Sequence, residues 1–109
     1  MRTLGFTNGM DLQRDDMIFP DKFKIGRTPY VVQYKAKLAC GSYGRVWPLA
    51  GVMHIELRKP KDMNVTFWHE ATHAILHDMN SPLWKDEKFV TAFSTRLAKM
   101  VDSAKFKES

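Results

Sequence analysis

His69-Glu70-Ala71-Thr72-His73 is the stretch of this chain that decides which fold we expect. Four residues advance an α-helix by about 6 Å and almost a full turn, so the two histidines project from one face. Their imidazole nitrogens can then meet on one Zn²⁺ ion at about 2.0 to 2.1 Å. Glu70 lies roughly a hundred degrees around the helix, where it can accept a proton from water beside the ion. The pattern predicts a zinc-bearing helix with Glu70 as general base.

The residues around this motif favour a buried helix. We expect it to run from Met63 to Met79, which contains neither Gly nor Pro, with Asp62 or Asn64 as its N-cap. The turn residues Asn80-Ser81-Pro82 would end it. Its apolar residues lie nearly all round the helix: Val65, Phe67, Trp68, Ala71, Ala74, Ile75 and Leu76. An ionisable cluster in such a helix needs a partner that offsets its desolvation, and Zn²⁺ would be that partner.

A third protein ligand is expected, because a catalytic zinc usually has three protein ligands and a water. His77 lies about 12 Å along the helix from His69, too far for three rings to meet on one ion, so we expect it to be structural. A second helix with an apolar stripe is expected from Trp84 to about Ala104. Glu87 lies at the edge of that stripe and is the better candidate for the third ligand. Asp86, nearer the middle of the stripe, is the alternative.

Two segments carry a resemblance to a known family. Thr66-Phe67-Trp68-His69-Glu70-Ala71-Thr72-His73-Ala74-Ile75-Leu76-His77 resembles the active helix of small gluzincin-type zinc metallopeptidases, especially the ImmA/IrrE group and its phage-borne relatives. Glu87-Lys88-Phe89-Val90-Thr91-Ala92-Phe93-Ser94 is similar to that group's second motif. The resemblance implies a zincin-like fold in which Glu87 joins His69 and His73 as a metal ligand. Residues 43–57 resemble the hairpin before the active helix.

The sequence departs from the family pattern at two neighbouring positions. Val90 stands where the family usually has a small residue. Thr91 stands where relatives often have an Asn or Asp that orients a ligand histidine. A threonine hydroxyl can still accept a hydrogen bond, so Thr91 is expected to retain part of that role.

The resemblance also implies how a substrate would bind and be cleaved. In similar enzymes an extended peptide pairs with the edge strand before the active helix, which here would be Gly51 to Arg58. The metal would polarise the carbonyl, and Glu70 would take a proton from the attacking water and protonate the leaving amine. Tyr43 and His54 are candidates for steadying the oxyanion, with packing as the alternative role of each.

The N-terminal half reads as strands and turns. Residues 22–38 alternate as a strand pair broken near Gly26-Arg27-Thr28-Pro29, and residues 46–50 and 52–57 are expected to form a hairpin. A short helix is expected from Asp11 to Met17. We therefore expect one α+β domain over residues 1–109, in which a small, mostly antiparallel sheet packs against the HExxH helix and a C-terminal helix. Its 44% hydrophobic residues are enough to fill one core.

Composition and hydrophobicity indicate in which cellular compartment the protein resides and which partners it can bind. The chain has no apolar run near 20 residues and no signal-peptide core, and its one cysteine, Cys40, is read as a reduced thiol without zinc-ligand spacing. We expect a cytoplasmic protein of a bacterium or phage-infected cell, with no membrane partner. The net charge of +5 leaves nucleic acid open as a partner, although the Lys and Arg are spread along the chain.

Three functions follow from these observations. The first is a zinc metallopeptidase acting on a protein or peptide. The second is a non-catalytic binding or inhibitor module, of a kind that a phage could encode, which keeps the zincin fold. The third is a protease similar to SprT that acts on DNA-bound proteins.

Overall fold

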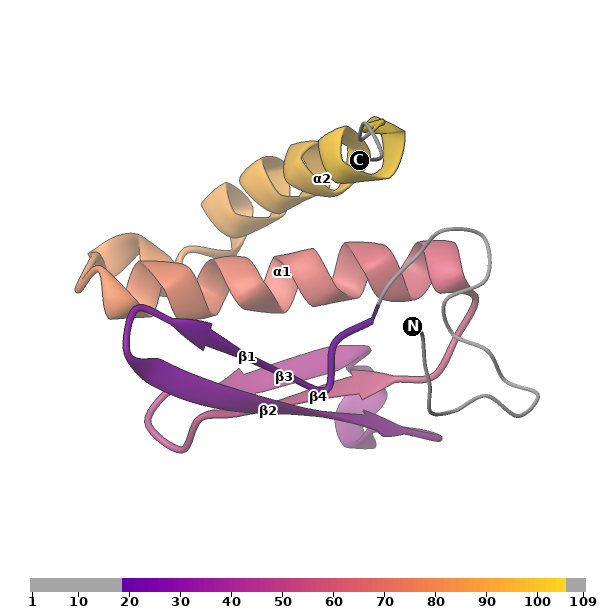
Figure 1. Ribbon diagram of the computed structural model, residues 1–109, viewed down its shortest axis with the longest axis horizontal. Coiled ribbons are helices and arrows are strands. Elements are labelled where there is room, and N and C mark those ends of the chain that lie inside the picture. The colour runs from indigo at the N-terminus through magenta and orange to yellow at the C-terminus, as the bar shows by residue number, and fades with distance from the viewer. Residues whose placement is uncertain (1–18, 106–109) are drawn as a thin grey trace, which may run out of the picture.

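A computed structural model describes residues 19–105, in which one helix covers one side of a four-stranded sheet and a second helix packs on the outside of the first (Figure 1). The expectation that the C-terminal helix packs against the sheet is therefore wrong. The strands are β1 (Lys22–Ile25), β2 (Thr28–Lys35), β3 (Gly44–Trp47) and β4 (Val52–Glu56). The helices are α1 (Pro60–Asp78) and α2 (Glu87–Ser103), and the 3-10 turns are η2 (Ala39–Gly41) and η3 (Pro82–Lys85). The expected α+β class is confirmed. The helix expected from Asp11 to Met17 lies outside the described residues.

The sheet has the strand order β1-β2-β4-β3. β1 pairs antiparallel with β2, β3 pairs antiparallel with β4, and β2 pairs parallel with β4. The expectation of a mostly antiparallel sheet is therefore confirmed. The expectation that Gly51 to Arg58 forms an edge strand is wrong, because β4 lies between β2 and β3, and the edge strands are β1 and β3.

The hairpin of β3 and β4 also begins earlier than expected. β3 starts at Gly44 instead of Val46 and ends at Trp47, because Pro48 opens a turn. The N–H groups of Ala50 and Gly51 donate to the Trp47 carbonyl, and Gly51 adopts a φ of 68°, which favours glycine.

The core lies between the sheet and α1. Met53 and Ile55 of β4 are fully buried, and they pack with Met63 and Phe67 of α1. Burial of side chains of this size contributes about 1.5 to 3 kcal/mol each. α1 is therefore held against the sheet through β4 and the neighbouring β3, and α2 lies on the far side of α1, as Figure 1 shows.

α1 begins three residues before the expected start. Lys59 is the N-cap and Pro60 occupies the first turn, where its missing N–H costs no hydrogen bond. Asp62 and Asn64, the expected caps, lie inside the helix instead. Asp62 forms an ion pair with Arg58, with 3.6 Å between the carboxylate oxygen and the guanidinium nitrogen. The Asn64 side-chain oxygen accepts a hydrogen bond from Trp68 Nε1. The expected end is close to the observed one, with Asn80 at a φ of 60° just beyond.

α2 begins later than expected. Trp84 belongs to η3, and Asp86 is the N-cap of α2, its carboxylate accepting from the Phe89 N–H at 3.0 Å. The buried residues of α2 are small or slender: Val90, Ser94 and Ala98. They let α2 approach α1 closely, which brings Glu87 over the histidines. No helix in residues 19–105 has an apolar stretch long enough to cross a membrane.

Candidate metal centre

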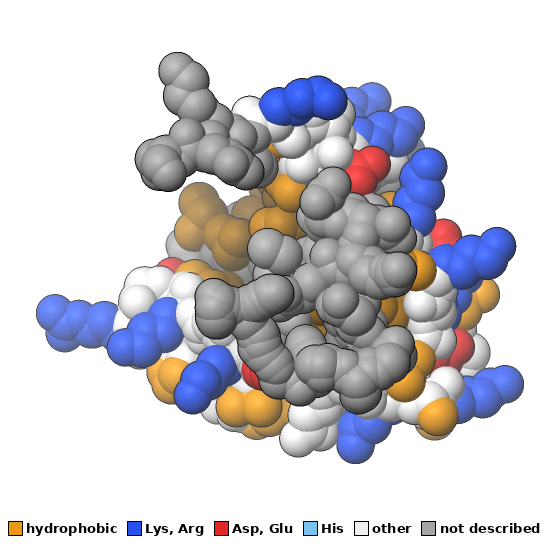
Figure 2. All heavy atoms as spheres, turned by 45° about the vertical axis from the view of Figure 1, so that its right-hand side comes forward, with side chains coloured by type: hydrophobic (Ala, Val, Ile, Leu, Met, Phe, Trp, Pro, Cys, Tyr) orange, Lys and Arg blue, Asp and Glu red, His pale blue; other side chains and the backbone are white. Residues whose placement is uncertain are grey.

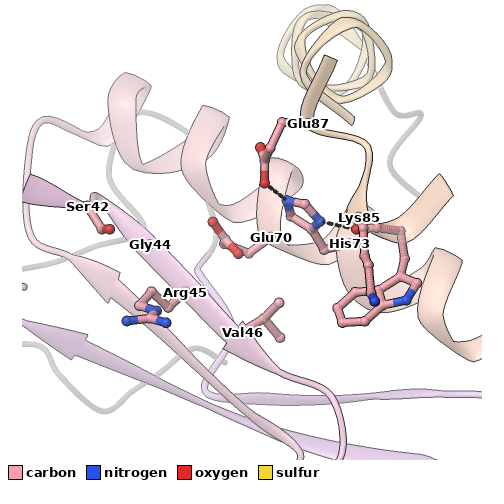
Figure 3. A pocket seen from close by; sticks show the side chains of 9 residues that line it. Ser42, Gly44, Arg45, Val46, Glu70, His73, Lys85 and Glu87 are labelled. Atoms are coloured by element: carbon pink, nitrogen blue, oxygen red, sulfur yellow. Dashed lines mark hydrogen bonds and ion pairs between the residues drawn. The ribbon is translucent and has the colours of Figure 1, made fainter. Parts of the chain in front are cut away.

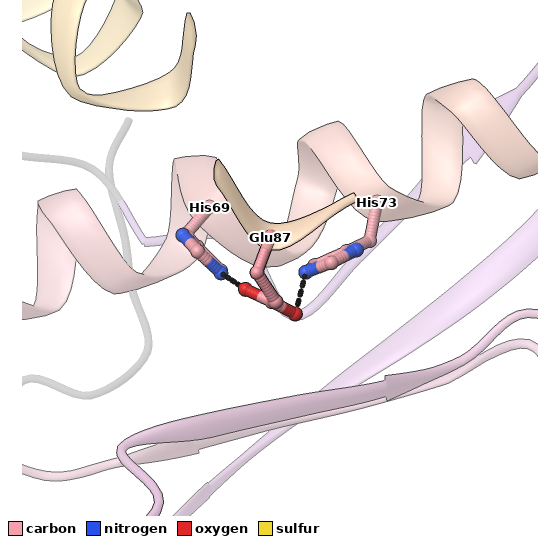
Figure 4. Close-up of side chains that lie close together, drawn as sticks. All are labelled: His69, His73 and Glu87. Carbon is pink, nitrogen blue, oxygen red and sulfur yellow. Dashed lines mark hydrogen bonds and ion pairs between the residues drawn. The ribbon is translucent and has the colours of Figure 1, made fainter. Parts of the chain in front are cut away.

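Two histidines of α1 and one glutamate of α2 meet at a single point. His69 and His73 lie one turn apart, with ring centroids 5.0 Å apart. Glu87, the first residue of α2, reaches across with one carboxylate oxygen 3.1 Å from His69 Nε2 and the other 3.0 Å from His73 Nε2 (Figure 4). The structure thus brings together the three residues that the sequence singled out as metal ligands.

The spacing of these atoms suits a divalent cation. One ligand atom from each residue lies within 4.8 Å of the others. Nitrogen and oxygen ligands of a tetrahedral Zn²⁺, at about 2.0 to 2.2 Å, stand roughly 3.3 Å apart. Two imidazoles and a carboxylate are also a usual ligand set of catalytic zinc. The group can therefore hold a metal ion with small side-chain shifts, and its chemistry does not identify the ion.

The surroundings of His73 favour a positive charge beside its ring. Its Nδ1 lies 2.6 Å from the carbonyl oxygen of Trp84, and its Nε2 lies 3.0 Å from Glu87 Oε2. A neutral imidazole has only one N–H, so it can donate to only one of these two acceptors. Both contacts are satisfied when a positive charge lies between Nε2 and the carboxylate, either as the second proton of the ring or as a metal ion, with the Nδ1 proton donated to Trp84.

His69 is oriented by a residue that sequence reasoning missed. Ser94 is buried on α2, and its Oγ lies 3.5 Å from His69 Nδ1. Thr91, which the family resemblance suggested for this role, is exposed. Ser94 lies seven residues after Glu87, which is two helical turns along the same face. That spacing was the available signal for Ser94.

Glu70 stands beside the group in a buried position. Burial raises the pKa of its carboxyl from 4.5 to about 7, while His73 and Arg45 oppose the rise and Glu87 adds to it. A carboxyl that takes up and releases a proton near neutral pH is suited to general base catalysis. Its placement next to the three ligands fits the role that the motif predicts for it.

A cavity of about 560 Å³ opens at Glu70 and His73. In Figure 3 both side chains point into it from α1, Glu87 lies above them, and Gly44 and Val46 lie on the strand opposite. Lys85 of η3 lines the other end. The edge strand β3 and the start of α2 thus flank the candidate metal group.

Gly44 is the second residue that sequence reasoning missed. A Cβ built on it would stand 2.5 Å from Thr66 Cγ2 and 3.0 Å from Glu70 Cγ, so only glycine lets β3 lie this close to α1. The strand expected from the sequence began at residue 46, whereas Gly44 is the first residue of β3. The signal was present in the glycine, but its meaning depended on the partner helix.

Several other candidates lie away from the group. His77 packs its ring edge-on against Trp84 at 4.8 Å, and Asp86 caps α2. His54 contacts Trp47 on the sheet face opposite α1, so it does not reach the site. Tyr43 is half exposed, with the Arg58 guanidinium 3.8 Å from its ring centroid. It lines a second hollow that His69 and Glu70 also line.

Comparison of the chain with protein-family models, curated proteins and solved structures gives no match.

Proposed function

We propose that this protein is a zinc-dependent peptidase. The observation that carries the proposal is the convergence of His69, His73 and Glu87, whose candidate ligand atoms lie within 4.8 Å of one another. The buried Glu70 beside that point supports a hydrolytic use of the metal. The likeness of residues 66–77 and 87–94 to the ImmA/IrrE group is consistent with a zincin-like domain and a peptide substrate.

The chemistry divides between the metal and the chain. Zinc, when bound, supplies Lewis acidity toward a carbonyl oxygen and lowers the pKa of a water. Glu70 would accept a proton from the water that attacks the peptide carbon and would pass that proton to the leaving amine. Trp84 holds His73 through its carbonyl, and Ser94 holds His69, so both rings keep their Nε2 atoms toward Glu87.

The substrate would lie along β3. The Glu56 N–H donates to the Tyr43 carbonyl, and bonding alternates along an antiparallel pair, so the N–H and C=O groups of Gly44 and Val46 point to the open edge. An extended peptide that pairs there would pass Glu70 in the cavity. This assignment replaces the strand expected from the sequence, which lies inside the sheet.

The decisive experiment compares the parent chain with Glu70→Gln after loading with zinc. Both are expected to hold one zinc per chain, because Glu70 is not a ligand. Only the parent is expected to cleave a peptide library, with new termini read by mass spectrometry. Equal cleavage by both chains would remove Glu70 as the base, and zinc binding without any cleavage by the parent would leave a structural metal.

A structural metal is the second candidate, and one observation favours it. Among the described elements, α2 packs only on α1 and η3 and has no contact with the sheet. A metal held by two residues of α1 and one of α2 would fasten that outer helix. In this case metal removal should detach α2 and no peptide should be cleaved, as expected for a binding or inhibitor module.

A further inference from the structure

The face of the sheet that points away from α1 has a composition unlike the rest of the molecule. The residues that strand register places on this face include four cations, Lys22, Lys24, Lys35 and Arg45, and one acid, Glu56. Glu56 is engaged, since its carboxylate accepts from the Leu38 N–H at 2.9 Å. Figure 2 shows Lys and Arg all round the visible margin, so total charge alone does not mark this face. The face is defined instead by the alternation of residues along the strands, which places these side chains on one side of the sheet.

The cations of this face surround an apolar and aromatic strip. Strand register places Lys22, Val31, Val52 and Trp47 side by side in one row across the sheet. Val31 of the interior strand β2 is 48% exposed, and Trp47 at the end of the edge strand β3 is 38% exposed, so the row presents apolar and aromatic surface to solvent. Neighbouring strands are about 4.8 Å apart, so the row is roughly 14 Å long.

A second row lies next to the first and is polar. Register places Gln33, His54 and Arg45 beside one another. The Arg45 guanidinium lies 5.3 Å from the Trp47 ring centroid, and the Trp47 and His54 rings meet edge to face at 4.8 Å. Burial and, secondarily, the charge of Lys35 lower the pKa of His54, which agrees with Lys35 lying on the same face.

We propose that this open face binds single-stranded nucleic acid. Proteins that bind single strands combine cations that follow the phosphates with aromatic rings on which the bases stack. Here the exposed Trp47 supplies the ring, with Arg45 at its side, and Lys22, Lys24 and Lys35 supply the phosphate contacts. An acidic polypeptide would use the cations but would have no use for the exposed indole, so the aromatic strip favours nucleic acid. The proposal does not depend on the metal centre.

The test is fluorescence anisotropy of a labelled oligothymidylate of about 15 nucleotides with the full chain at several salt concentrations. The parent is expected to bind, with affinity falling as salt rises. Trp47→Ala is expected to weaken binding about 5- to 150-fold, the range found when a stacking aromatic is truncated. Phe93→Ala is the matched control, because Phe93 is 49% exposed on α2, far from the sheet, and should leave binding unchanged.

A second pair of variants isolates local charge from net charge. Lys22→Glu with Lys24→Glu should weaken binding and lower the slope of log affinity against log salt by about 1.4. Lys88→Glu with Lys99→Glu changes net charge equally on α2 and should have a much smaller effect. If Trp47→Ala does not fold, as judged by circular dichroism, the difference in binding between the sheet lysine pair and the helix lysine pair tests the proposal.

Three results would overturn the proposal. The first is equal weakening by the sheet and helix variants, which would mean a general charge effect. The second is equally tight binding of a duplex, which would show that bases do not stack. The third is equally effective competition by a polyglutamate of matched charge, which would assign the face to acidic polypeptides.

Discussion

Gly44 of the edge strand lies directly against Glu70 of α1, so that a side chain at residue 44 would collide with the candidate base. A Cβ atom added to Gly44 would lie 2.5 Å from Thr66 Cγ2 and 3.0 Å from Glu70 Cγ. The same approach that places the base beside the metal group also brings the free edge of β3 to the cavity. Strand and base therefore depend on a single glycine.

Gly44→Ala is expected to lower kcat for peptide cleavage at least tenfold, because Glu70 or β3 must move by several tenths of an ångström. Zinc content should remain one per chain, since no ligand is touched. Thr66→Ser removes the closest methyl group but keeps the hydroxyl that donates to the Asp62 carbonyl at 3.1 Å. Adding it to Gly44→Ala should restore part of the activity. Full activity in Gly44→Ala alone would contradict the proposed contact.

Ser94→Ala is expected to weaken zinc binding about tenfold, because His69 loses the partner that orients its ring. Thr91→Ala is the matched control from the same helix and should leave the affinity unchanged, since Thr91 is exposed. Competition with a fluorescent chelator measures both. A larger effect at Thr91 than at Ser94 would assign the orienting role to Thr91 instead.

Replacing Asp86 and Glu87 by Ala, one at a time, should have different effects on zinc content and on stability. Asp86→Ala is expected to cost about 1 kcal/mol of unfolding free energy through loss of the N-cap, with zinc content unchanged. Glu87→Ala should instead lose zinc, because it removes the only carboxylate that contacts both histidines within the described residues. Elemental analysis and urea unfolding check the two outcomes. Zinc loss in the Asp86 variant would make it the ligand.

In the metal-free protein, the free energy of unfolding should depend on pH through the ionisation of Glu70. Burial raises the pKa of Glu70 from 4.5 to about 7, so the fold favours the protonated carboxyl. Its contribution to stability is fully present below pH 4.5 and is lost as pH rises through about 7. At about 1.4 kcal/mol per pH unit, this window corresponds to about 3 kcal/mol.

Glu70→Gln cannot ionise and should avoid that loss. Relative to the parent, the variant is expected to gain unfolding free energy between pH 5 and pH 8, as measured by urea titration in EDTA. The comparison between two chains cancels the titration of the groups they share. A difference that stays constant across this pH range would show that Glu70 ionises as easily in the fold as in the unfolded chain.

The local elements of the site were accessible from the sequence. The i, i+4 spacing of His69 and His73 puts both rings on one helical face wherever that helix packs, because helix geometry is local. The end of α1 near Asn80 followed from local turn chemistry in the same way. Glu87 was accessible through its position on the second helix and through the resemblance of its motif. These features need no knowledge of which strand pairs with which.

Only the tertiary structure decided the rest. β4 lies inside the sheet because it pairs with β2, a strand distant in sequence, while its apolar side packs against α1. This pairing leaves β3 as an edge strand. The roles of Gly44, Ser94 and the Trp84 carbonyl each arise from a contact between different elements, which spacing along the chain does not encode. The basic, aromatic sheet face has the same origin: its cations are dispersed in sequence and meet only because strand register aligns them.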